Sequence, residues 1–384
     1  MIKVDSRCSA CQACIQICPR HCVSLDDNYR VQVASDECIN CGACQKVCQL
    51  SQSVKLNTPI DIYAAYNRDV KELYQSSSGG IGGLLLRNNL LKDFKVFSAI
   101  NNQCIEPIID EIFLHDIHKA IKSKYCFSDI NNSYVRCKDY LDRGFNVLYL
   151  ALPCQVAGLK LYLKKDYGNL FCVDIFCHGA PAPIELRRQI NYKSRNDKRV
   201  VDLQFRDKSV SRWGDYCYLY RYSDGSTSSG PALCDFYFSN FLKGSFLREC
   251  CYQCQYACFE RVGDLSIGDY WHIKTKHLNR DINGISAVLV NNKKGKYLWN
   301  IIKEFCEFEQ GSKQGVENAT HAIVQPIKYP RDYMSYVSVS QWEYNKIARK
   351  YECSLLQIAR MIRFKLRKQS RSLNIWWRTN SAWE

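Results

Sequence analysis

Short apolar runs bounded by turn residues recur through the middle of the chain. Three of them, at Lys95–Ile100, Asn146–Leu152 and Leu170–Phe176, have the length and boundaries of buried strands. Between the last two runs, the segment Gln155–Lys165 repeats its apolar residues at helical spacing. A strand, a helix and a strand within about 30 residues predict a βαβ unit with parallel strands.

Two further patterns follow this unit. The segments Val200–Arg206 and Asp215–Tyr222 are joined through turn residues and predict an antiparallel pair. Near the end of the chain, apolar residues recur every three or four positions with Arg and Lys between them, which predicts an amphipathic helix or helix pair over Lys346–Trp377. The apolar positions of this stripe are Ile347, Tyr351, Leu355, Ile358, Ile362 and Leu366.

Cysteine content sets this chain apart from an ordinary globular protein of 384 residues. It has 23 cysteines, and nine of them fall between Cys8 and Cys48. The N-terminal residues lack the apolar core of a secretory signal, and nowhere do 18 apolar residues run together, so we expect a cytoplasmic protein without a transmembrane helix. Reducing conditions favour metal sites over disulfides for so many thiols.

The first cysteines form two copies of one pattern, Cys-x2-Cys-x2-Cys-x3-Cys. Three cysteines at x2 spacing wrap one side of a [4Fe–4S] cubane, and the fourth ligates the cubane of the other copy. The predicted ligand sets are Cys8, Cys11, Cys14 and Cys48 for one cluster, and Cys38, Cys41, Cys44 and Cys18 for the other.

Over about 50 residues this pattern resembles bacterial-type dicluster ferredoxins. Zinc sites use paired Cys pairs and not a doubled run of four, so the zinc alternative is disfavoured. Gln49 stands where the first repeat has Pro19, and because proline is not a ligand, we expect the clusters to form regardless. Cys22 is predicted to be a buried spectator.

A series of motifs follows the cysteine-rich module. The motifs are Ser76–Gly80 with the helix candidate Ile81–Leu91, Lys122–Tyr125 with Ser128-Asp129, Leu152–Leu159, Phe176–Gly179, Phe205–Lys208 with Trp213-Gly214, Leu247-Arg248, Cys251–Cys254, Gly263-Asp264 and Ile267–Trp271. In this order they resemble the coenzyme F-420 hydrogenase/dehydrogenase beta-subunit family over roughly residues 1–310. One motif departs from the family pattern, since this chain has Ala151-Leu152 where the family usually has a small residue and Thr before the proline.

The resemblance implies an FAD, one iron–sulfur cluster in the body, and a fused dicluster ferredoxin. We therefore predict an α+β protein with a ferredoxin-like domain over 1–56, a mixed α/β FAD-binding body over 57–330 and a basic helical tail over 331–384. Partners of this family include ferredoxins, and its membership does not determine the substrate.

The predicted flavin site combines a glycine-rich turn with charged residues. Ser78, Gly79 and Gly80 before a helix offer bare backbone N–H groups to a pyrophosphate, although a plain Ser/Gly turn would have the same sequence. Mobile cations could clamp the phosphates or stabilise an anionic reduced flavin, and the Ile267–Trp271 strand end could hydrogen-bond and stack on the ring. The candidate residues for these roles are Lys122, Lys124, Arg206, Asp269 and Trp271.

Four cysteines of the body are predicted to hold a third [4Fe–4S] cluster. Cys154 and Cys177 each follow a predicted strand, and adjacent parallel strands place their carboxyl ends at one sheet edge. Cys251 and Cys254 add two thiols at chelating x2 spacing. Either Cys250 or Cys258 could replace one of these ligands. The other cysteines of the body are expected to be small apolar fillers.

The expected function is that of an iron–sulfur flavoprotein oxidoreductase. FAD would exchange hydride with coenzyme F-420 or another two-electron substrate, and the clusters would relay single electrons to a ferredoxin or partner enzyme. The alternative is an electron-transfer adaptor subunit with no substrate site of its own. No catalytic residue is assigned from the sequence.

Charge is concentrated at the C-terminal end. The chain carries a formal net charge of +15, and residues 341–384 hold ten Lys/Arg against three Glu. Docking to a partner or to a membrane surface fits a basic amphipathic helix, and simple packing of the stripe on the body is the alternative. Nucleic acid is not expected as a partner, because Trp376 and Trp377 form a single pair instead of being interleaved along a groove.

Overall fold

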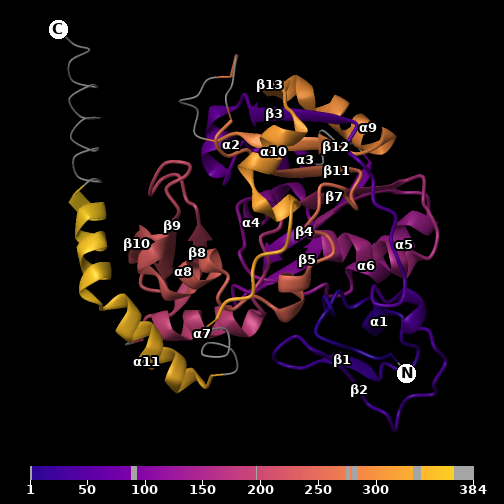
Figure 1. The fold of residues 1–384 in the computed structure, drawn as a ribbon, viewed down its shortest axis with the longest axis horizontal. Coiled ribbons are helices and arrows are strands. Elements are labelled where there is room, and N and C mark those ends of the chain that lie inside the picture. The colour runs from indigo at the N-terminus through magenta and orange to yellow at the C-terminus, as the bar shows by residue number, and fades with distance from the viewer. Residues whose placement is uncertain are drawn as a thin grey trace.

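A computed structural model describes residues 2–87, 93–195, 197–273, 277–278, 284–331 and 339–366. Its centre is an eight-stranded mixed sheet of order β13-β3-β12-β11-β7-β6-β4-β5, seen in the upper and middle part of Figure 1. The strands are β3 (Asp61–Asn67), β4 (Phe94–Asn101), β5 (Pro107–Glu111), β6 (Asn146–Ala151), β7 (Leu170–Ile175), β11 (Leu265–Asp269), β12 (Ser286–Val290) and β13 (Cys306–Gln310).

The four central strands β4, β6, β7 and β11 run parallel, and the outer strands pair antiparallel with their neighbours. Both faces of the parallel part are buried. On β6, Val147 and Tyr149 face one core and Leu148 faces the other, as the two-residue period of a strand requires. This explains why the central strands appear in the sequence as continuous apolar runs.

Helices cover both faces of this sheet. One face packs against α5 (Ser133–Asp142) and α6 (Pro153–Leu163), and the other against α3 (Ile81–Leu85) and α9 (Lys293–Ile302). Two shorter helices, α2 (Val70–Gln75) and α4 (Ile117–Ala120), lie in connections between strands, and α10 (Lys313–Ala319) follows the last strand.

A second, three-stranded antiparallel sheet lies beside the large one (Figure 1). Its strands are β8 (Val200–Phe205), β9 (Cys217–Tyr222) and β10 (Thr227–Pro231), and it packs on α7 (Pro183–Lys193) and α8 (Phe236–Lys243). The core between them is rich in aromatic rings, among them Phe205, Tyr220 and Phe238. Aromatic packing of this kind stabilises small sheets that have few aliphatic residues.

The N-terminal module contains α1 (Ala13–Gln16), η1 (Gln45–Val47) and the hairpin of β1 (Val23–Leu25) and β2 (Val31–Val33). Ala13 and Val47 are fully buried in the same core as α5 and α6. The module therefore packs directly on the body. The boundaries at residues 56 and 330 stay predictions.

The observed sheets and helices are consistent with the expected α+β class, and the predicted βαβ unit is confirmed. The segments Asn146–Leu152, Gln155–Lys165 and Leu170–Phe176 form β6, α6 and β7, and β6 pairs in parallel with β7. The antiparallel pair β8–β9 is also present. The helix expected over Ile81–Leu91 ends at Leu85, and residues 88–92 lie outside the described part of the chain.

The C-terminal stripe divides into two parts with different surroundings. Helix α11 (Gln341–Glu352) packs Tyr344 and Ala348 against Tyr192 and Phe236 of the body. Residues 355–366 form a second helix, in which Leu355 is 87% exposed and Ile362 is 54% exposed. Simple packing on the body thus describes α11. The following helix also packs Met361 and Phe364 on the body, but it leaves the side chains of the stripe exposed.

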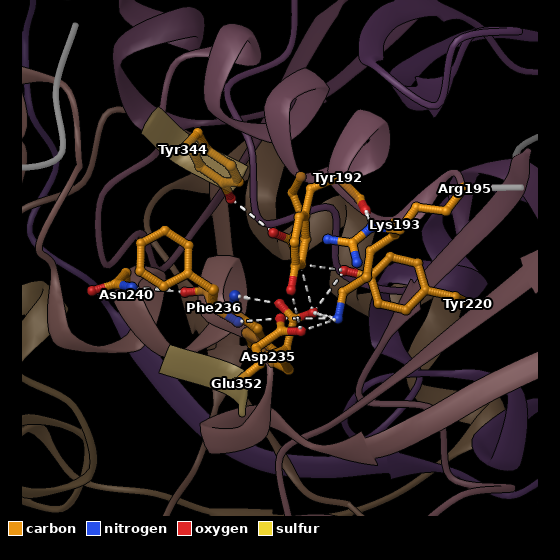
Figure 2. A network of polar contacts seen from close by, with 11 residues as sticks. Tyr192, Lys193, Arg195, Tyr220, Asp235, Phe236, Asn240, Tyr344 and Glu352 are labelled. Atoms are coloured by element: carbon orange, nitrogen blue, oxygen red, sulfur yellow. Dashed lines mark hydrogen bonds and ion pairs between the residues drawn. The ribbon is translucent and has the colours of Figure 1, made fainter. Parts of the chain in front are cut away.

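A buried polar network anchors α11 (Figure 2). Lys193 on α7 lies 2.8 Å from Glu352 at the end of α11 and 3.6 Å from Asp235. Tyr344 donates a hydrogen bond of 2.8 Å to Gln189, and Gln189 donates one of 2.8 Å to Asp235. Residues 367–384, including Trp376 and Trp377, lie outside the described part of the chain.

Across the described residues, no helix has both the length and the apolar character needed to cross a membrane.

Candidate cofactor sites

The four body cysteines meet around one cavity of ≈910 Å³. Cys154 opens α6 directly after β6, Cys177 follows β7, and Cys251 and Cys254 come from η4 (Glu249–Gln253) and its end. Burial raises the pKa of Cys154, and the nearby thiols of Cys177, Cys254 and Cys251 raise it further. The structure therefore brings together the four thiols expected to hold the third cluster.

Gly179 makes this approach possible. Its φ is +121°, in the left-handed region, and a Cβ at this position would stand 2.5 Å from Leu247 and 3.3 Å from Cys251. Glycine alone lets the turn after Cys177 reach the Cys251 loop.

The two alternative ligands lie in different places. Cys250 is buried and lines the same cavity as the four thiols. Cys258 does not line it, and its Sγ lies 3.2 Å from the carbonyl oxygen of Glu260. Of the two, Cys250 is the one placed to replace a predicted ligand.

The N-terminal cysteines form two groups. Burial and the neighbouring thiols of Cys11, Cys8, Cys48 and Cys44 raise the pKa of Cys14, so the four cysteines of the first group lie together and Cys44 of the second group is close to them. The second group, Cys18, Cys38, Cys41 and Cys44, lines a separate small cavity. Cys22 lines it too, with its Sγ 3.5 Å from that of Cys18.

The first group lies against the body and the second at the surface. A Cβ at Gly158 on α6 would stand 2.8 Å from the Cβ of Cys11, so glycine permits this close packing. Cys41, by contrast, is exposed. No group of three or more Cys, His, Asp or Glu in the described residues could hold a single metal ion. A cubane differs because each of its thiolates binds a different iron, which sets the sulfurs further apart.

Gln49 joins the module to the body. Its Nε2 donates a hydrogen bond of 2.8 Å to the carbonyl oxygen of Cys154, and its Oε1 accepts one of 2.7 Å from the hydroxyl of Tyr256. Proline at this position, as at Pro19, could make neither contact. The departure from the ferredoxin repeat therefore has a structural role that the sequence pattern did not reveal.

We predict that Gln49→Ala weakens the contact between module and body. The change removes both hydrogen bonds, so the carbonyl oxygen of Cys154 and the hydroxyl of Tyr256 each lose one partner, at a cost of about 1–3 kcal/mol. Amide hydrogen exchange over residues 43–52 should become at least about fivefold faster. Gln52→Ala, at an exposed position three residues away, serves as the control. Equal exchange in both variants would contradict the role of Gln49.

The predicted flavin residues surround a second cavity of ≈530 Å³ at the carboxyl ends of β6, β7 and β11. In sheets of this kind, ligands bind at that edge. All the predicted contacts except Gly79 line it, namely Ser78, Gly80, Lys122, Lys124, Arg206, Asp269 and Trp271.

Gly79 corrects one expectation. Its N–H, expected to be bare, donates a hydrogen bond of 3.0 Å to the hydroxyl of Ser286. A Cβ there would stand 2.5 Å from the carbonyl oxygen of Ala65. Gly79 thus lets the turn pack on β3 and β12, and its N–H is not free for a phosphate.

The expectation of mobile cations is wrong. Arg206 is 8% exposed and makes a bidentate pair with Asp269, at 2.6 and 2.7 Å. Lys122 pairs with Asp207 at 2.5 Å. Lys124 donates to the carbonyl oxygen of Ile121 at 3.1 Å, and burial lowers the pKa of Lys124 to about 7. Acidic or carbonyl partners hold all three in place.

Lys208 lies in the Phe205–Lys208 motif, but the sequence analysis predicted no role for it. Its Nζ donates hydrogen bonds of 2.7 Å to the carbonyl oxygens of Leu73 and Ser78. Burial lowers the pKa of Lys208 to about 7. Trp271 stacks on Trp213, with ring centroids 4.4 Å apart. In the sequence, the only indication of the role of Lys208 is that it stands in the charged Phe205–Lys208 motif.

The two cavities adjoin. Both are lined by Leu152 and by residues 177–180, which include Cys177. The cysteine cavity is also lined by Ser9, Gln49 and Leu50 of the N-terminal module. One continuous path therefore leads from the predicted flavin site past the body cysteines to the module.

Comparison with known proteins finds similarity of two kinds. A family model for the carboxyl-terminal part of the beta subunit of coenzyme F420 hydrogenase/dehydrogenase matches residues 145–314. A ferredoxin of Saccharopolyspora erythraea is 27% identical over 92 residues, which are 24% of this chain and 85% of the relative. A ferredoxin-like protein of Rhizobium leguminosarum is 36% identical over 47 residues, which are 12% of this chain and 48% of the relative.

Among solved structures, the F420-reducing [NiFe] hydrogenase complex of Methanosarcina barkeri, in a xenon derivative, contains a similar chain. The TM-score is 0.45 at 17% identity, over 77% of this chain and 90% of the other.

The doubled cysteine motif and the ferredoxin matches define an iron–sulfur electron-transfer protein. Residues 145–314, which carry Cys154, Cys177, Cys251 and Cys254, are similar to the carboxyl-terminal part of the beta subunit of coenzyme F420 hydrogenase/dehydrogenase.

Proposed function

We propose that this protein is an iron–sulfur flavoprotein oxidoreductase with FAD in the cavity lined by residues 76–78 and a third [4Fe–4S] cluster on the body cysteines. The observation that carries the proposal is the contact between the two cavities through residues 177–180. An electron released at the flavin then has an acceptor next to it.

The residues that line the two cavities fit a [4Fe–4S] cluster and an FAD. Four thiols around one cavity are the usual ligands of a [4Fe–4S] cluster. The flavin cavity has the size of a cofactor site, with cations and aromatic rings in its walls and a glycine-rich turn at its edge. Asp207 and Asp269 balance Lys122 and Arg206, and Lys124, with its pKa of about 7, adds a partial positive charge that suits an anionic ligand.

When bound, FAD supplies the exchange between hydride chemistry and single-electron transfer. The chain holds and orients it. Lys208 anchors the turn at Ser78, and Asp269 fixes the plane of the Arg206 guanidinium toward the cavity wall. Lys124, with a pKa of about 7, can take up or release a proton at Nζ near neutral pH.

The order of the proposed relay follows from burial. The body cysteines adjoin the flavin cavity, Cys11 packs against α6, and Cys41 is exposed at the far end of the module. Electrons would thus leave or enter through the second N-terminal cluster. Ile39, 61% exposed beside Cys41, marks the surface where a ferredoxin or partner enzyme would dock.

The test is flavin binding and reduction by the isolated chain after anaerobic reconstitution. The protein should be brown, show flavin and iron–sulfur absorption, and release FAD with acid. Reduced coenzyme F-420 is the first two-electron donor to assay, since the family match supports it as the substrate class. A protein that binds no added FAD would overturn this proposal and support the adaptor subunit.

The exposed stripe after α11 also carries a prediction. Leu355, Ile358 and Ile362 are exposed beside Arg360 and Arg363, a pattern that suits an anionic lipid surface. We expect flotation with anionic liposomes, and at least about a tenfold loss of binding for Ile358→Asn with Ile362→Asn. The control is Val201→Asn, an exposed apolar residue on β8. Flotation that is absent, or unchanged by the double substitution, would contradict this role.

A further inference from the structure

Arg248 occupies the boundary between the body cysteines and the first N-terminal cluster site. It directly precedes η4 and is 9% exposed. Its side chain lines the cavity of Cys154, Cys177, Cys251 and Cys254. It also lines a neighbouring cavity of ≈360 Å³ that Cys8 lines from the module side.

This guanidinium lacks the acidic partner that other buried arginines have. Its Nη1 donates a hydrogen bond of 2.5 Å to the carbonyl oxygen of Ser9, inside the Cys8–Cys11 loop, and it lies 3.5 Å above the ring of Phe127. Its buried Nε has no hydrogen-bond partner, and no Asp or Glu in the described part of the chain is ion-paired with it. Arg261, by comparison, pairs with Asp174 at 2.6 Å.

An unpaired buried cation is costly, and arginine does not escape the cost by losing its proton. A bound anion would therefore stabilise the Arg248 guanidinium, because no carboxylate of the described residues is paired with it. A four-thiolate [4Fe–4S] cluster is an anion, and it gains one further negative charge on reduction. A nearby fixed cation stabilises the reduced form more than the oxidised form.

We infer that Arg248 is a shared counter-charge for two clusters, the one on the body cysteines and the one on Cys8, Cys11, Cys14 and Cys48. It raises both reduction potentials, and its bond to Ser9 holds the two cysteine loops together. The inference rests on the proposed function, because it takes the body cluster as given. Arg248 is a positioning and tuning residue that bonds to neither substrate nor iron.

The test is a redox titration of the full-length reconstituted protein, monitored by electron paramagnetic resonance. Arg248→Gln should make reduction of both clusters at least tenfold less favourable, a shift of about 59 mV to more negative potential for a one-electron couple. The cluster on Cys18, Cys38, Cys41 and Cys44 should keep its potential. Arg248→Lys, which keeps the charge, should stay near the wild type.

Arg143→Gln is the matched control. Arg143 is exposed, pairs with Asp139 at 3.0 Å and lines neither of the two cavities that Arg248 lines, so its removal should leave all potentials unchanged. If the control variant shifts the potentials as much as Arg248→Gln does, the inference is overturned. An equal shift of all three clusters in Arg248→Gln would overturn it as well. Unchanged potentials in an Arg248→Gln protein with full iron would overturn it too.

Two outcomes separate this inference from the proposed function. Wild-type protein with only about 8 irons per chain would refute the body cluster, while the cluster on Cys8 would still report on Arg248. If Arg248→Gln loses iron, the iron content and the potentials of Arg248→Lys test the inference instead. Full iron and wild-type potentials in Arg248→Lys support the inference, and a negative shift despite the retained charge overturns it.

Discussion

Changing both Cys251 and Cys254 to serine is expected to lower the iron content from about 12 to about 8 atoms per chain. The two thiols supply half of the proposed ligand set around the body cavity, and serine hydroxyls do not replace thiolates on iron–sulfur clusters. The N-terminal clusters should survive, because their cysteines belong to a separate part of the chain. Electron flow from FAD to them should slow, since the acceptor beside the flavin is gone.

Iron analysis of the anaerobically reconstituted protein checks this result. The control is Cys104→Ser with Cys353→Ser, which removes two exposed thiols and should leave the iron content unchanged. If the wild type itself holds only about 8 irons, the four body thiols are structural. If it holds more and the double change has no effect, another cysteine is a ligand. Cys250, which lines the cavity, would then be tested first.

Gly82→Leu is expected to weaken FAD binding by at least about 100-fold, which corresponds to about 2.8 kcal/mol. Gly82 lies on α3 and lines the flavin cavity, and a Cβ there would make ordinary contact with Ile267 at 3.5 Å. The backbone therefore tolerates a side chain. The larger leucine side chain fills space that the cofactor needs, whereas Gly82→Ala should bind FAD almost as the wild type does.

Fluorescence titration of the apoprotein with FAD measures this effect. Gly168→Leu makes the same change at an exposed glycine with open space around it, and its FAD affinity should match the wild type. Iron content should be normal in both variants, which separates a blocked cavity from a misfolded protein. Full FAD affinity in Gly82→Leu would contradict the assignment of this cavity to the flavin.

Local patterns were sufficient to predict the centre of the fold. The runs at β6 and β7 are apolar on both faces because both faces are buried, and α6 between them makes the strands parallel. Because β6 and β7 are parallel neighbours, Cys154 and Cys177, which follow them, lie at the same edge of the sheet. The predicted gathering of cysteines thus needed only strand positions and one general rule of parallel sheets.

Contacts between distant segments were beyond the reach of the same reasoning. Arg206 was expected to be mobile because a lone arginine usually lies in water, yet Asp269, 63 residues away, holds it in place. Gln49 was expected to be an inconsequential replacement of proline, because its contact with Tyr256, distant in the sequence, is not visible in the repeat. A motif states which residues are present, but an ion pair depends on how the chain brings them together.

Periodicity likewise predicts an apolar face without saying what covers it. The stripe from Ile347 to Leu366 has one continuous helical spacing, yet its first part packs on the body and its second part is exposed. The change falls near Cys353, where α11 ends. Surface complementarity of the body decides between these two states, and the stripe itself carries no information about it.

The central claim is that one chain holds FAD and three clusters in electronic contact. A reductive titration of the fully reconstituted protein with dithionite, followed by visible absorption and electron paramagnetic resonance, tests it most directly. The account predicts uptake of about five electrons per chain, two by FAD and one by each cluster. Uptake of only about two electrons per chain, both by the N-terminal clusters, would contradict it.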